Sequence, residues 1–288
     1  MMRKKPMLAY PVSAKPIDYS KPTFIQPKLD GVRCVIQYER RAQPREDVVV
    51  AYSRTGKEWK NIQHILAELK PFFQLNPNVI LDGELYNHDL KNDFEKIISL
   101  VRKTKPTAED RVESAEKVQF HCYDNINEEY VFEERMAFIY NNLEESYCIV
   151  NVPTIRVFKH EEALNVHNDE NLKNGYEGSI VRLNTEYQCK RSHSLRKFKD
   201  FSDAEAIIVG YEEGKGKREG TLGKFMMQDE DGNKFGCPPG KGHNYQDMRD
   251  MLNNIHEYMG QTATFTYFER TKAGSYRHPL FKCIRNYE

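Results

Sequence analysis

The N-terminal part of the chain alternates between two hydrophobic patterns. Short apolar and β-branched runs are typical of strands, whereas apolar residues that recur every three or four positions are typical of amphipathic helices. The short runs predict strands over residues 23–25, 32–38, 48–53, 78–86, 118–123, 155–158 and 179–183. The longer period predicts helices over residues 61–73, 93–101, 129–143 and 161–173. Strands and helices mixed in this way predict an α+β fold.

The pattern changes after residue 199. Short strands are predicted over residues 204–211, 223–228, 234–236, 262–268 and 281–285, with one helix over residues 245–258. Asp231-Gly232-Asn233 has the composition of a tight hairpin turn. Five short strands and one helix suit a small OB-type β-barrel. We therefore place a boundary near Phe201 and expect two domains, residues 1–201 and 202–288.

Length and composition agree with this division. A chain of 288 residues is too long for one typical hydrophobic core. Apolar residues make up 39% and charged residues 30%, as in ordinary soluble proteins, and no apolar run is long enough to span a bilayer. The basic N-terminus is followed by prolines instead of the apolar core of a signal peptide. We expect no membrane association and a cytoplasmic location.

Charge and cysteine usage limit the possible ligands. The cysteines are scattered singly without a C-x-x-C pair, so a zinc knuckle is not predicted. The net charge is zero, but basic residues gather at 190–199, 215–218 and 102–105, and acidic residues at 128–134 and 161–170. Local charge, not net charge, determines affinity for phosphates. These clusters would fit a basic groove that binds phosphates, with the acidic residues on the opposite surface. The alternative is that each cluster is a solvated surface without a ligand.

The hexapeptide Lys28-Leu29-Asp30-Gly31-Val32-Arg33 carries the most chemistry. A lysine between a strand and a turn is a candidate covalent nucleophile for a phosphoryl or nucleotidyl group. Gly31 lets the backbone approach a ligand closely, and Arg33 offers a planar fork for a phosphate or sugar. The alternative is that Lys28 is an ordinary surface lysine.

Three further blocks follow in order. They are Leu81-Asp82-Gly83-Glu84-Leu85, Glu177-Gly178-Ser179-Ile180-Val181 and Leu195-Arg196-Lys197-Phe198-Lys199. Glu84 and Glu177 provide hard oxygen ligands that suit Mg²⁺ or Mn²⁺, unless they are strand-end acids that face solvent. Lys197 and Lys199 alternate on one predicted strand and point the same way. Because two ammonium groups in one pocket repel, a phosphate between them is the simplest explanation.

In this order, the four blocks resemble the motifs of the covalent nucleotidyltransferase superfamily, K-x-D-G-x-R, D-G-E, E-G and K-x-K. They are most similar to those of the small ATP-dependent DNA ligases of viruses and phages. The resemblance runs from about Met7 to the end of the chain. It implies an adenylation domain with antiparallel sheets and flanking helices, followed by an OB-fold domain. Many members end in R-x-D-K, whereas here Arg285 precedes Asn286, which leaves the roles of Arg277 and Arg285 open.

The resemblance also implies an activity. It is ATP- and Mg²⁺-dependent sealing of nicks in duplex DNA by a monomer, in the cytoplasm of a bacterium or a virus-infected host cell. Lys28 would first carry AMP and then pass it to the 5′-phosphate at the nick. The 3′-hydroxyl would finally displace this AMP and close the strand. The alternatives are an mRNA-capping guanylyltransferase or RNA ligase with the same lysine chemistry, and a non-catalytic OB-type nucleic-acid binding protein.

The residues that match family positions follow from the same resemblance. Tyr123 would stack on adenine, and Gln26 stands where many relatives carry an acid that reads the adenine amino group; its carbonyl can accept that hydrogen bond. The implied nucleotide contacts are Gln26, Lys28, Arg33, Arg54, Glu84, Tyr123, Lys197, Lys199 and Arg285. The implied DNA contacts are Arg33, Arg54, Arg182, Lys215, Lys217 and Arg218. A core tyrosine and structural salt bridges are the alternatives for Tyr123 and the first three arginines.

Overall fold

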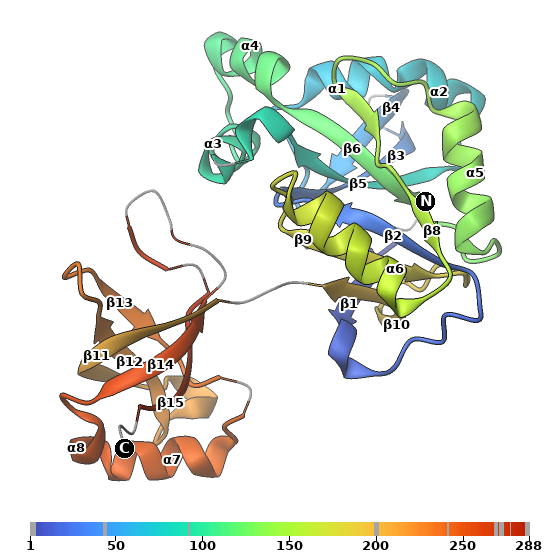
Figure 1. Ribbon diagram of the computed structural model, residues 1–288. Coiled ribbons are helices and arrows are strands. Elements are labelled where there is room, and N and C mark those ends of the chain that lie inside the picture. Colours follow the sequence, from blue (N-terminus) through green and yellow to red (C-terminus); the bar gives the residue numbers. More distant parts are fainter. Residues whose placement is uncertain are drawn as a thin grey trace. The chain divides into compact units, whose positions relative to one another are not determined.

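The computed structural model describes residues 4–42, 45–91, 93–198, 202–240, 242–267, 270, 274–276 and 278–285. Contacts divide the chain into a first unit, Met1–Lys199, and a second unit, Asp200–Glu288 (Figure 1). The first unit contains two five-stranded sheets with helices, and the second unit contains one five-stranded sheet. The predicted α+β class is confirmed. Within the described residues, no helix is long and apolar enough to cross a membrane.

One sheet of the first unit carries the lysine of the first motif block. Its strand order is β1-β10-β9-β2-β8, formed by β1 (Leu8–Pro11), β2 (Thr23–Lys28), β8 (Ile155–Val157), β9 (Gly178–Leu183) and β10 (Arg191–Phe198). Strand β2 pairs antiparallel with β9, in a register that places Lys28 opposite Gly178. The first and third motif blocks are therefore neighbours across one ladder. Strand β1, which the sequence pattern does not predict, pairs parallel with β10.

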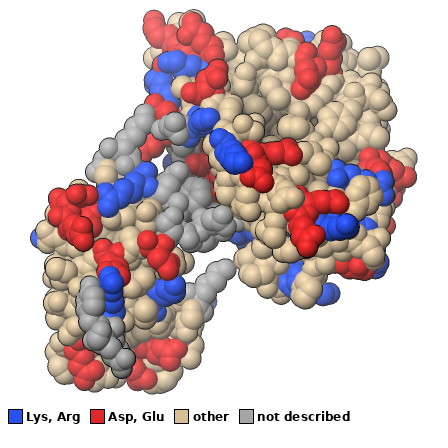
Figure 2. All heavy atoms as spheres, viewed as in Figure 1, with Lys and Arg blue, Asp and Glu red and all other residues tan. Residues whose placement is uncertain are grey.

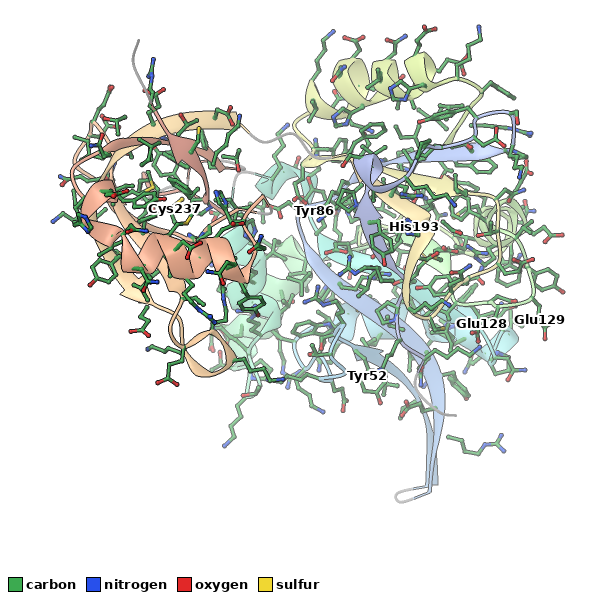
Figure 3. All side chains as sticks on the ribbon, turned by 90° about the horizontal axis from the view of Figure 1, so that it is seen from below. Tyr52, Tyr86, Glu128, Glu129, His193 and Cys237 are labelled. Carbon is green, nitrogen blue, oxygen red and sulfur yellow. The ribbon has the colours of Figure 1, made fainter. Side chains whose placement is uncertain are left out.

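The second sheet has the order β4-β3-β5-β6-β7. It consists of β3 (Val32–Ala42), β4 (Arg45–Tyr52), β5 (Ile80–Tyr86), β6 (Gln119–Asn125) and β7 (Ile149–Asn151). Figure 3 shows β3 and β4 running side by side as a long hairpin. The register of β3 and β5 places Arg33 opposite Glu84. The second motif block, which contains Glu84, thus lies beside Arg33, the last residue of the first motif block.

Helices cover one face of this second sheet. They are α1 (Gln63–Glu68), α2 (Lys70–Leu75), α3 (Phe94–Val101), α4 (Ala108–Lys117) and α5 (Phe132–Asn142), with the short η1 (Val12–Ala14) and η2 (His88–Leu90) elsewhere in the unit. Ile36 and Leu81 point toward the helices and share a buried cluster with Ile65 and Ile139. Because successive side chains on a strand point to opposite faces, Arg33, Asp82 and Glu84 point away from the helices.

Two predicted helices of the first unit differ in detail from the observed ones, and one observed helix was not predicted. The helix predicted over residues 61–73 is divided at Leu69 into α1 and α2, and Pro71 follows the break. Proline lacks the amide hydrogen that would continue the helical ladder. The stretch predicted over residues 161–173 is α6 (His160–Asn165) followed by a π-helix, η3 (Val166–Leu172). Helix α4 is not predicted, although the Thr107–Asp110 capping box is a readable start signal.

The second unit is a closed arrangement of short strands. It contains β11 (Ser202–Glu213), β12 (Leu222–Gln228), β13 (Lys234–Cys237), β14 (Thr262–Tyr267) and β15 (Leu280–Ile284), in the order β13-β12-β11-β14-β15. The amide of Phe281 donates to the Pro238 carbonyl (2.9 Å), and the amide of Gly240 donates to the Phe281 carbonyl (3.0 Å). These bonds join the segment after β13 to β15, so the two ends of the sheet meet as in a barrel.

The core and turns of the second unit follow its sequence. Ile208, Phe225 and Phe265 are fully buried inside the barrel. The predicted hairpin turn links β12 and β13, and Gly232 adopts a φ of 82° that favours glycine. The helix predicted over residues 245–258 is interrupted at Asn254, which separates α7 (Tyr245–Asn253) from α8 (Ile255–Tyr258). The unit also contains the short helix η4 (Gly216–Arg218).

Candidate active site

A pocket of about 240 Å³ lies between the two sheets of the first unit. From the strands β2, β9 and β10 it is lined by Gln26, Lys28, Arg182 and Lys197. From the opposite sheet it is lined by Arg33, Glu84 and Tyr123, and from the segment after β4 by Arg54. One cavity is therefore surrounded by predicted site residues that are far apart in the sequence. We call it the nucleotide pocket, after the nucleotide contacts that the family resemblance implies for these residues.

Lys28 enters this pocket at the end of β2. Its Nζ forms an ion pair with Glu177 Oε2, and the amide of Glu177 donates to the Lys28 carbonyl (3.1 Å). The Lys28 side chain is 21% exposed and that of Glu177 is 5% exposed. The β2–β9 register thus presents a reachable amine beside a buried carboxylate. The structure brings the first and third motif blocks together.

Two glycines allow this close approach of backbones. A Cβ atom on Gly31 would lie 2.4 Å from the Leu85 carbonyl oxygen and 2.7 Å from Glu84 Cγ. Gly178 has a φ of 145°, and a Cβ there would lie 2.4 Å from the Phe198 carbonyl oxygen. Any larger residue would push apart the strands that carry the lysine and the carboxylates.

Tyr123 forms the wall of the pocket opposite β2. Its hydroxyl donates to Glu84 Oε2 (3.2 Å). The guanidinium carbons of Arg33 and Arg182 each lie 5.2 Å from the centre of its ring. Cation–π contacts of this kind fix the plane of an aromatic ring. The ring is therefore held in one orientation and can serve as a stacking surface.

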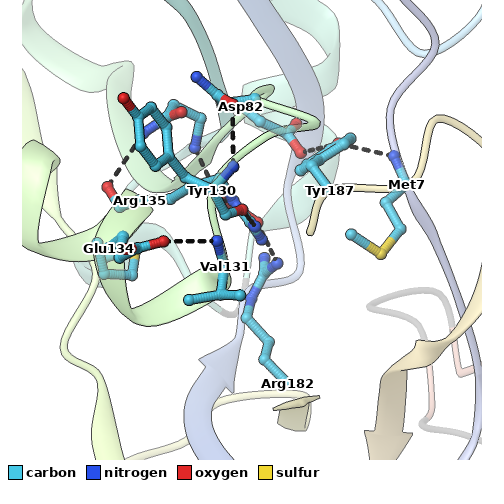
Figure 4. Close-up of polar contacts among 12 residues, drawn as sticks. Met7, Asp82, Tyr130, Val131, Glu134, Arg135, Arg182 and Tyr187 are labelled. Carbon is cyan, nitrogen blue, oxygen red and sulfur yellow. Dashed lines mark hydrogen bonds and ion pairs between the residues drawn. The ribbon is translucent and has the colours of Figure 1, made fainter. Parts of the chain in front are cut away.

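Two fully buried carboxylates hold these arginines, and Figure 4 labels Asp82, Arg135, Arg182 and Tyr187 of this network. Asp82 accepts from Arg33 Nε (2.6 Å) and from the Tyr187 hydroxyl (2.6 Å). Asp124 accepts from Arg182 Nη1 (2.7 Å) and from Arg135 Nε (2.7 Å). Buried charges of opposite sign stabilise each other only when they are paired in this way.

This network corrects the DNA-contact prediction for Arg182. The residue is only 4% exposed, and its guanidinium is bound to Asp124 and Gln26. We therefore assign it to orienting Gln26 and Tyr123, not to the DNA surface. Arg33 keeps 18% of its side chain exposed and lines the pocket while it is paired with Asp82.

Glu84 has an unusual protonation equilibrium. Burial raises the pKa of its carboxyl group to about 7, and this effect outweighs the opposing influence of Arg33, Lys28 and the Tyr123 hydroxyl. Near neutral pH the side chain is therefore divided between its protonated and ionised forms. Groups with such shifted pKa values concentrate at functional sites.

A second pocket, of about 630 Å³, adjoins the nucleotide pocket and shares Arg33, Arg54 and Glu84 with it. We call it the cationic pocket, because its other lining residues include Lys57, Trp59, Arg102 and Lys103. Lys103 is paired with Asp110. Among the described residues, Arg54, Lys57 and Arg102 have no ion pair. Three cations without a carboxylate partner favour a phosphate-bearing ligand.

The remaining predicted residues lie elsewhere. Lys199 and Arg277 fall outside the described residues. Arg285 forms an ion pair with Glu205 within the second unit. Lys215 and Lys217 are exposed at η4, whereas Arg218 is half-buried and donates to Met248 Sδ (3.0 Å) on α7.

The surface charges do not separate into one basic and one acidic side on the face that Figure 2 shows. Basic and acidic side chains form small interspersed groups there. Glu128 and Glu129, labelled in Figure 3, are exposed, and Glu128 pairs with Lys4. Similarly, Glu133 pairs with Arg156 (3.3 Å). The acidic stretch at residues 128–134 is therefore partly neutralised by its own neighbours.

Comparison with known families agrees with this geometry. Residues 6–199 match the family described as "ATP dependent DNA ligase domain", and residues 213–285 match "DNA ligase OB-like domain". The chain belongs to the ATP-dependent DNA ligase family. The predicted resemblance to ligases and the predicted OB-type second domain are confirmed.

Individual relatives of this ligase chain are distant. A DNA ligase of African swine fever virus (isolate Pig/Kenya/KEN-50/1950) is 30% identical over 212 residues, which cover 69% of this chain and 47% of the relative. The chain thus spans about half the length of the curated relatives that it matches.

Solved ligase structures share the fold. A structure from work on Lig E DNA ligases has a TM-score of 0.77 at 22% identity, covering 99% of this chain and 100% of that one. The ATP-dependent DNA ligase of bacteriophage T7 in complex with ATP has a TM-score of 0.53 at 19% identity, covering 98% of both chains.

The ligase pocket also depends on residues to which the sequence analysis assigned no role. Asp82 and Asp124 anchor the arginines, and Thr154 contacts Gln26. Asp82 lies inside the second motif block and Asp124 directly follows Tyr123, so their positions were a usable signal. Thr154 has no such signal, because it is brought to the site only by the path of the chain before β8.

The pKa of Glu84 leads to a stability prediction. Because the folded-state pKa of about 7 exceeds the usual value of 4.5, the folded protein binds more protons than the unfolded chain between these pH values. Its free energy of unfolding therefore falls as the pH rises through this range. Glu84→Gln removes the ionisation. At pH 8 we expect this variant to be more stable than the wild type by up to about 3 kcal/mol.

Urea denaturation at pH 5 and pH 8, without nucleotide or metal, measures this difference. The advantage of Glu84→Gln should be small at pH 5. Glu116→Gln, which changes an exposed acid on α4, is the matched control and should show no such pH dependence. Equal stability of wild type and Glu84→Gln at pH 8 would contradict the prediction.

Proposed function

We propose that this protein seals nicks in duplex DNA as an ATP-dependent ligase, with Lys28 as the nucleophile. The observation that carries the proposal is the reachable Lys28 amine in a pocket that also contains Tyr123 and Glu84. Such a pocket offers a stacking surface for a base, an acid for a ribose or metal, and an amine for the phosphate. Binding and positioning supply much of the catalysis in phosphoryl transfer.

In the first step, Lys28 Nζ, after losing a proton, attacks the α-phosphorus of ATP. A phosphorus–nitrogen bond forms, the bond to the bridging oxygen breaks, and pyrophosphate leaves. Glu177 Oε2 holds the lysine toward the pocket before the attack. Lys197 lines the same pocket and would stabilise charge on the α-phosphate, and we propose the same role for Lys199. We assign Arg285 to the leaving pyrophosphate by family resemblance.

In the second step, the nick 5′-phosphate oxygen attacks the lysyl-AMP phosphorus and releases the Lys28 amine. In the third step, the 3′-hydroxyl attacks the 5′-phosphate, AMP leaves, and the strand is closed. We propose that residues 1–201 carry out these transfers and that the OB domain, residues 202–288, contributes to duplex binding.

The donor set of the nucleotide pocket fits Mg²⁺. Within the described part of the chain, no group of three or more His, Cys, Asp or Glu residues could hold a metal ion by itself. Mg²⁺ is typically held by one or two carboxylates together with substrate phosphate and water, and Glu84 and Glu177 could supply these carboxylates. The ion, when bound, would offset charge on the phosphate oxygens.

We propose that the 5′-phosphorylated strand lies in the cationic pocket, against Arg54, Lys57 and Arg102. Its continuity with the nucleotide pocket would place that phosphate beside the adenylate. The exposed Lys215 and Lys217 would contact the duplex from the second domain, and Arg218 would position their loop through Met248.

Charge reversal tests this assignment. Lys57→Glu combined with Arg102→Glu should weaken binding of a nicked duplex by roughly tenfold or more in low salt. The plot of log binding constant against log salt concentration should also become less steep, with its slope reduced in magnitude by about two. Lys70→Glu with Lys159→Glu, which changes two exposed lysines elsewhere in the first unit, is the control. Identical affinity and salt slope in both double variants would refute the assignment.

Incubation with labelled ATP and Mg²⁺, followed by a nicked DNA duplex, tests the function. We expect a protein-linked AMP that disappears as sealed DNA forms. An adduct with GTP but not ATP would indicate a capping guanylyltransferase, and sealing of RNA but not DNA would indicate an RNA ligase. The absence of any lysine-linked nucleotide would favour a non-catalytic nucleic-acid binding protein.

A further inference from the structure

We infer that Thr154 is a positioning residue that, together with Arg182, fixes the side-chain amide of Gln26 so that only its oxygen faces the nucleotide base. The pocket would thereby select a base with an amino group, adenine, over one with a carbonyl group, guanine or hypoxanthine. This inference rests on the proposed function, because it concerns the nucleotide that Lys28 attacks.

Gln26 lines the nucleotide pocket two residues before Lys28, and it is only 1% exposed. Its Nε2 donates to the Thr154 hydroxyl oxygen (2.9 Å) and to the Tyr123 carbonyl oxygen (3.1 Å). Its Oε1 accepts from Arg182 Nε (2.6 Å). Both amide hydrogens are therefore used within the protein, while the oxygen retains a second lone pair.

The opposite orientation of the amide is unfavourable at its contacts with Arg182 and Tyr123. After a half-turn, Nε2 would face the N–H of Arg182, donor against donor. Oε1 would face the carbonyl oxygen of Tyr123, acceptor against acceptor. A buried polar group without a partner is costly. The surroundings thus determine which end of the amide faces which neighbour.

Thr154 is itself oriented. Its hydroxyl donates to the Val152 carbonyl oxygen (3.2 Å), so its single hydrogen points away from Gln26 and its oxygen can only accept there. Arg182 is held in turn by Asp124 (2.7 Å), which Arg135 binds from the other side (2.7 Å). The Val152 carbonyl therefore orients Thr154, and Asp124 orients Arg182. These two residues in turn orient the amide of Gln26.

The base that meets this amide encounters an acceptor. The amino group of adenine can donate to the free lone pair of Gln26 Oε1, whereas the carbonyl oxygen of guanine or hypoxanthine would be repelled. Sites built around a specific hydrogen bond reject an analogue that cannot make it more strongly than hydrophobic pockets do. Gln26 can act in this way only while Thr154 and Arg182 prevent rotation of its amide.

The test compares nucleotide selectivity in the full-length protein. Lysyl-nucleotide formation is measured with ATP and with inosine triphosphate, which carries a carbonyl in place of the amino group. We expect Thr154→Val to lower the ratio of kcat/KM for ATP to kcat/KM for inosine triphosphate by about tenfold. The substitution removes a hydrogen-bond acceptor without changing the shape of the side chain. Thr154→Ser, which keeps the hydroxyl, should retain the wild-type ratio.

The outcomes separate this inference from the proposed function. A residue with a merely structural role would lower the rates with both nucleotides equally, so an unchanged ratio in Thr154→Val overturns the inference while lysyl-AMP formation still supports the ligase chemistry. A lower ratio in Thr154→Val that Thr154→Ser does not share supports it. If the wild type forms no lysyl-nucleotide with ATP, both the proposed function and the inference fail.

Discussion

Replacing Lys28 by alanine removes lysyl-AMP formation and nick sealing, by roughly 10⁴-fold or more. The amine is the atom that bonds to phosphorus, and the pocket offers it to the α-phosphate beside Glu177. Lys28→Arg is expected to be equally inactive, because a guanidinium keeps its charge and is a poor nucleophile. Intact-mass spectrometry after incubation with ATP and Mg²⁺ reports the added AMP directly.

The matched control for this prediction is Lys21→Ala. Lys21 is an exposed lysine that precedes the same strand, β2, and its carboxylate partner Asp18 lies at 3.9 Å. It should be adenylated as fully as the wild type. AMP attached to Lys28→Ala at any other side chain would show that the reaction does not depend on this amine.

The largest expected effect on stability is that of Asp124→Asn, which should lower the free energy of unfolding by about 3–5 kcal/mol. Asp124 is fully buried and accepts from both Arg135 and Arg182. An amide has no negative charge, so two buried guanidinium groups would lose their counterion. Urea denaturation at pH 7, followed by fluorescence or circular dichroism, measures the change.

Two further variants determine whether charge pairing is the cause. Asp18→Asn changes an acid whose side chain is 60% exposed, and it should shift stability by less than about 0.5 kcal/mol. Adding Arg135→Met to Asp124→Asn removes one of the orphaned cations and should recover part of the loss, which a double-mutant cycle quantifies. Wild-type stability of Asp124→Asn would refute the account.

The same buried pairs connect the fold to the chemistry. Asp82 and Asp124 hold Arg33 and Arg182 against the ring of Tyr123, so removing either carboxylate charge would also disturb the surface that we propose for the base. We therefore expect mild variants of this network to raise KM for ATP before they lower stability greatly. Precise placement of reactants depends on such supporting contacts.

Much of the secondary structure could be read from hydrophobic periodicity. All predicted strands of the first unit and all five of the second correspond to observed strands, because one or both faces of each are buried. The short edge strands β1 and β7 were missed, since three or four residues carry too little pattern. Helix α4 was missed because its exposed surface is mostly charged, so its capping residues were the better signal.

The sequence by itself determined the chemical class of this protein. Lys28, Glu84, Glu177 and Lys197 are reactive or charged residues whose type and order define the family, whatever their exact contacts. Only the tertiary structure decided that Arg182 points inward, that the Glu84 carboxyl has a pKa of about 7, and that the Gln26 amide is locked. These properties depend on strand register and on burial beside partners that are distant in sequence, such as Asp124 and Thr154, and local sequence does not encode such distances.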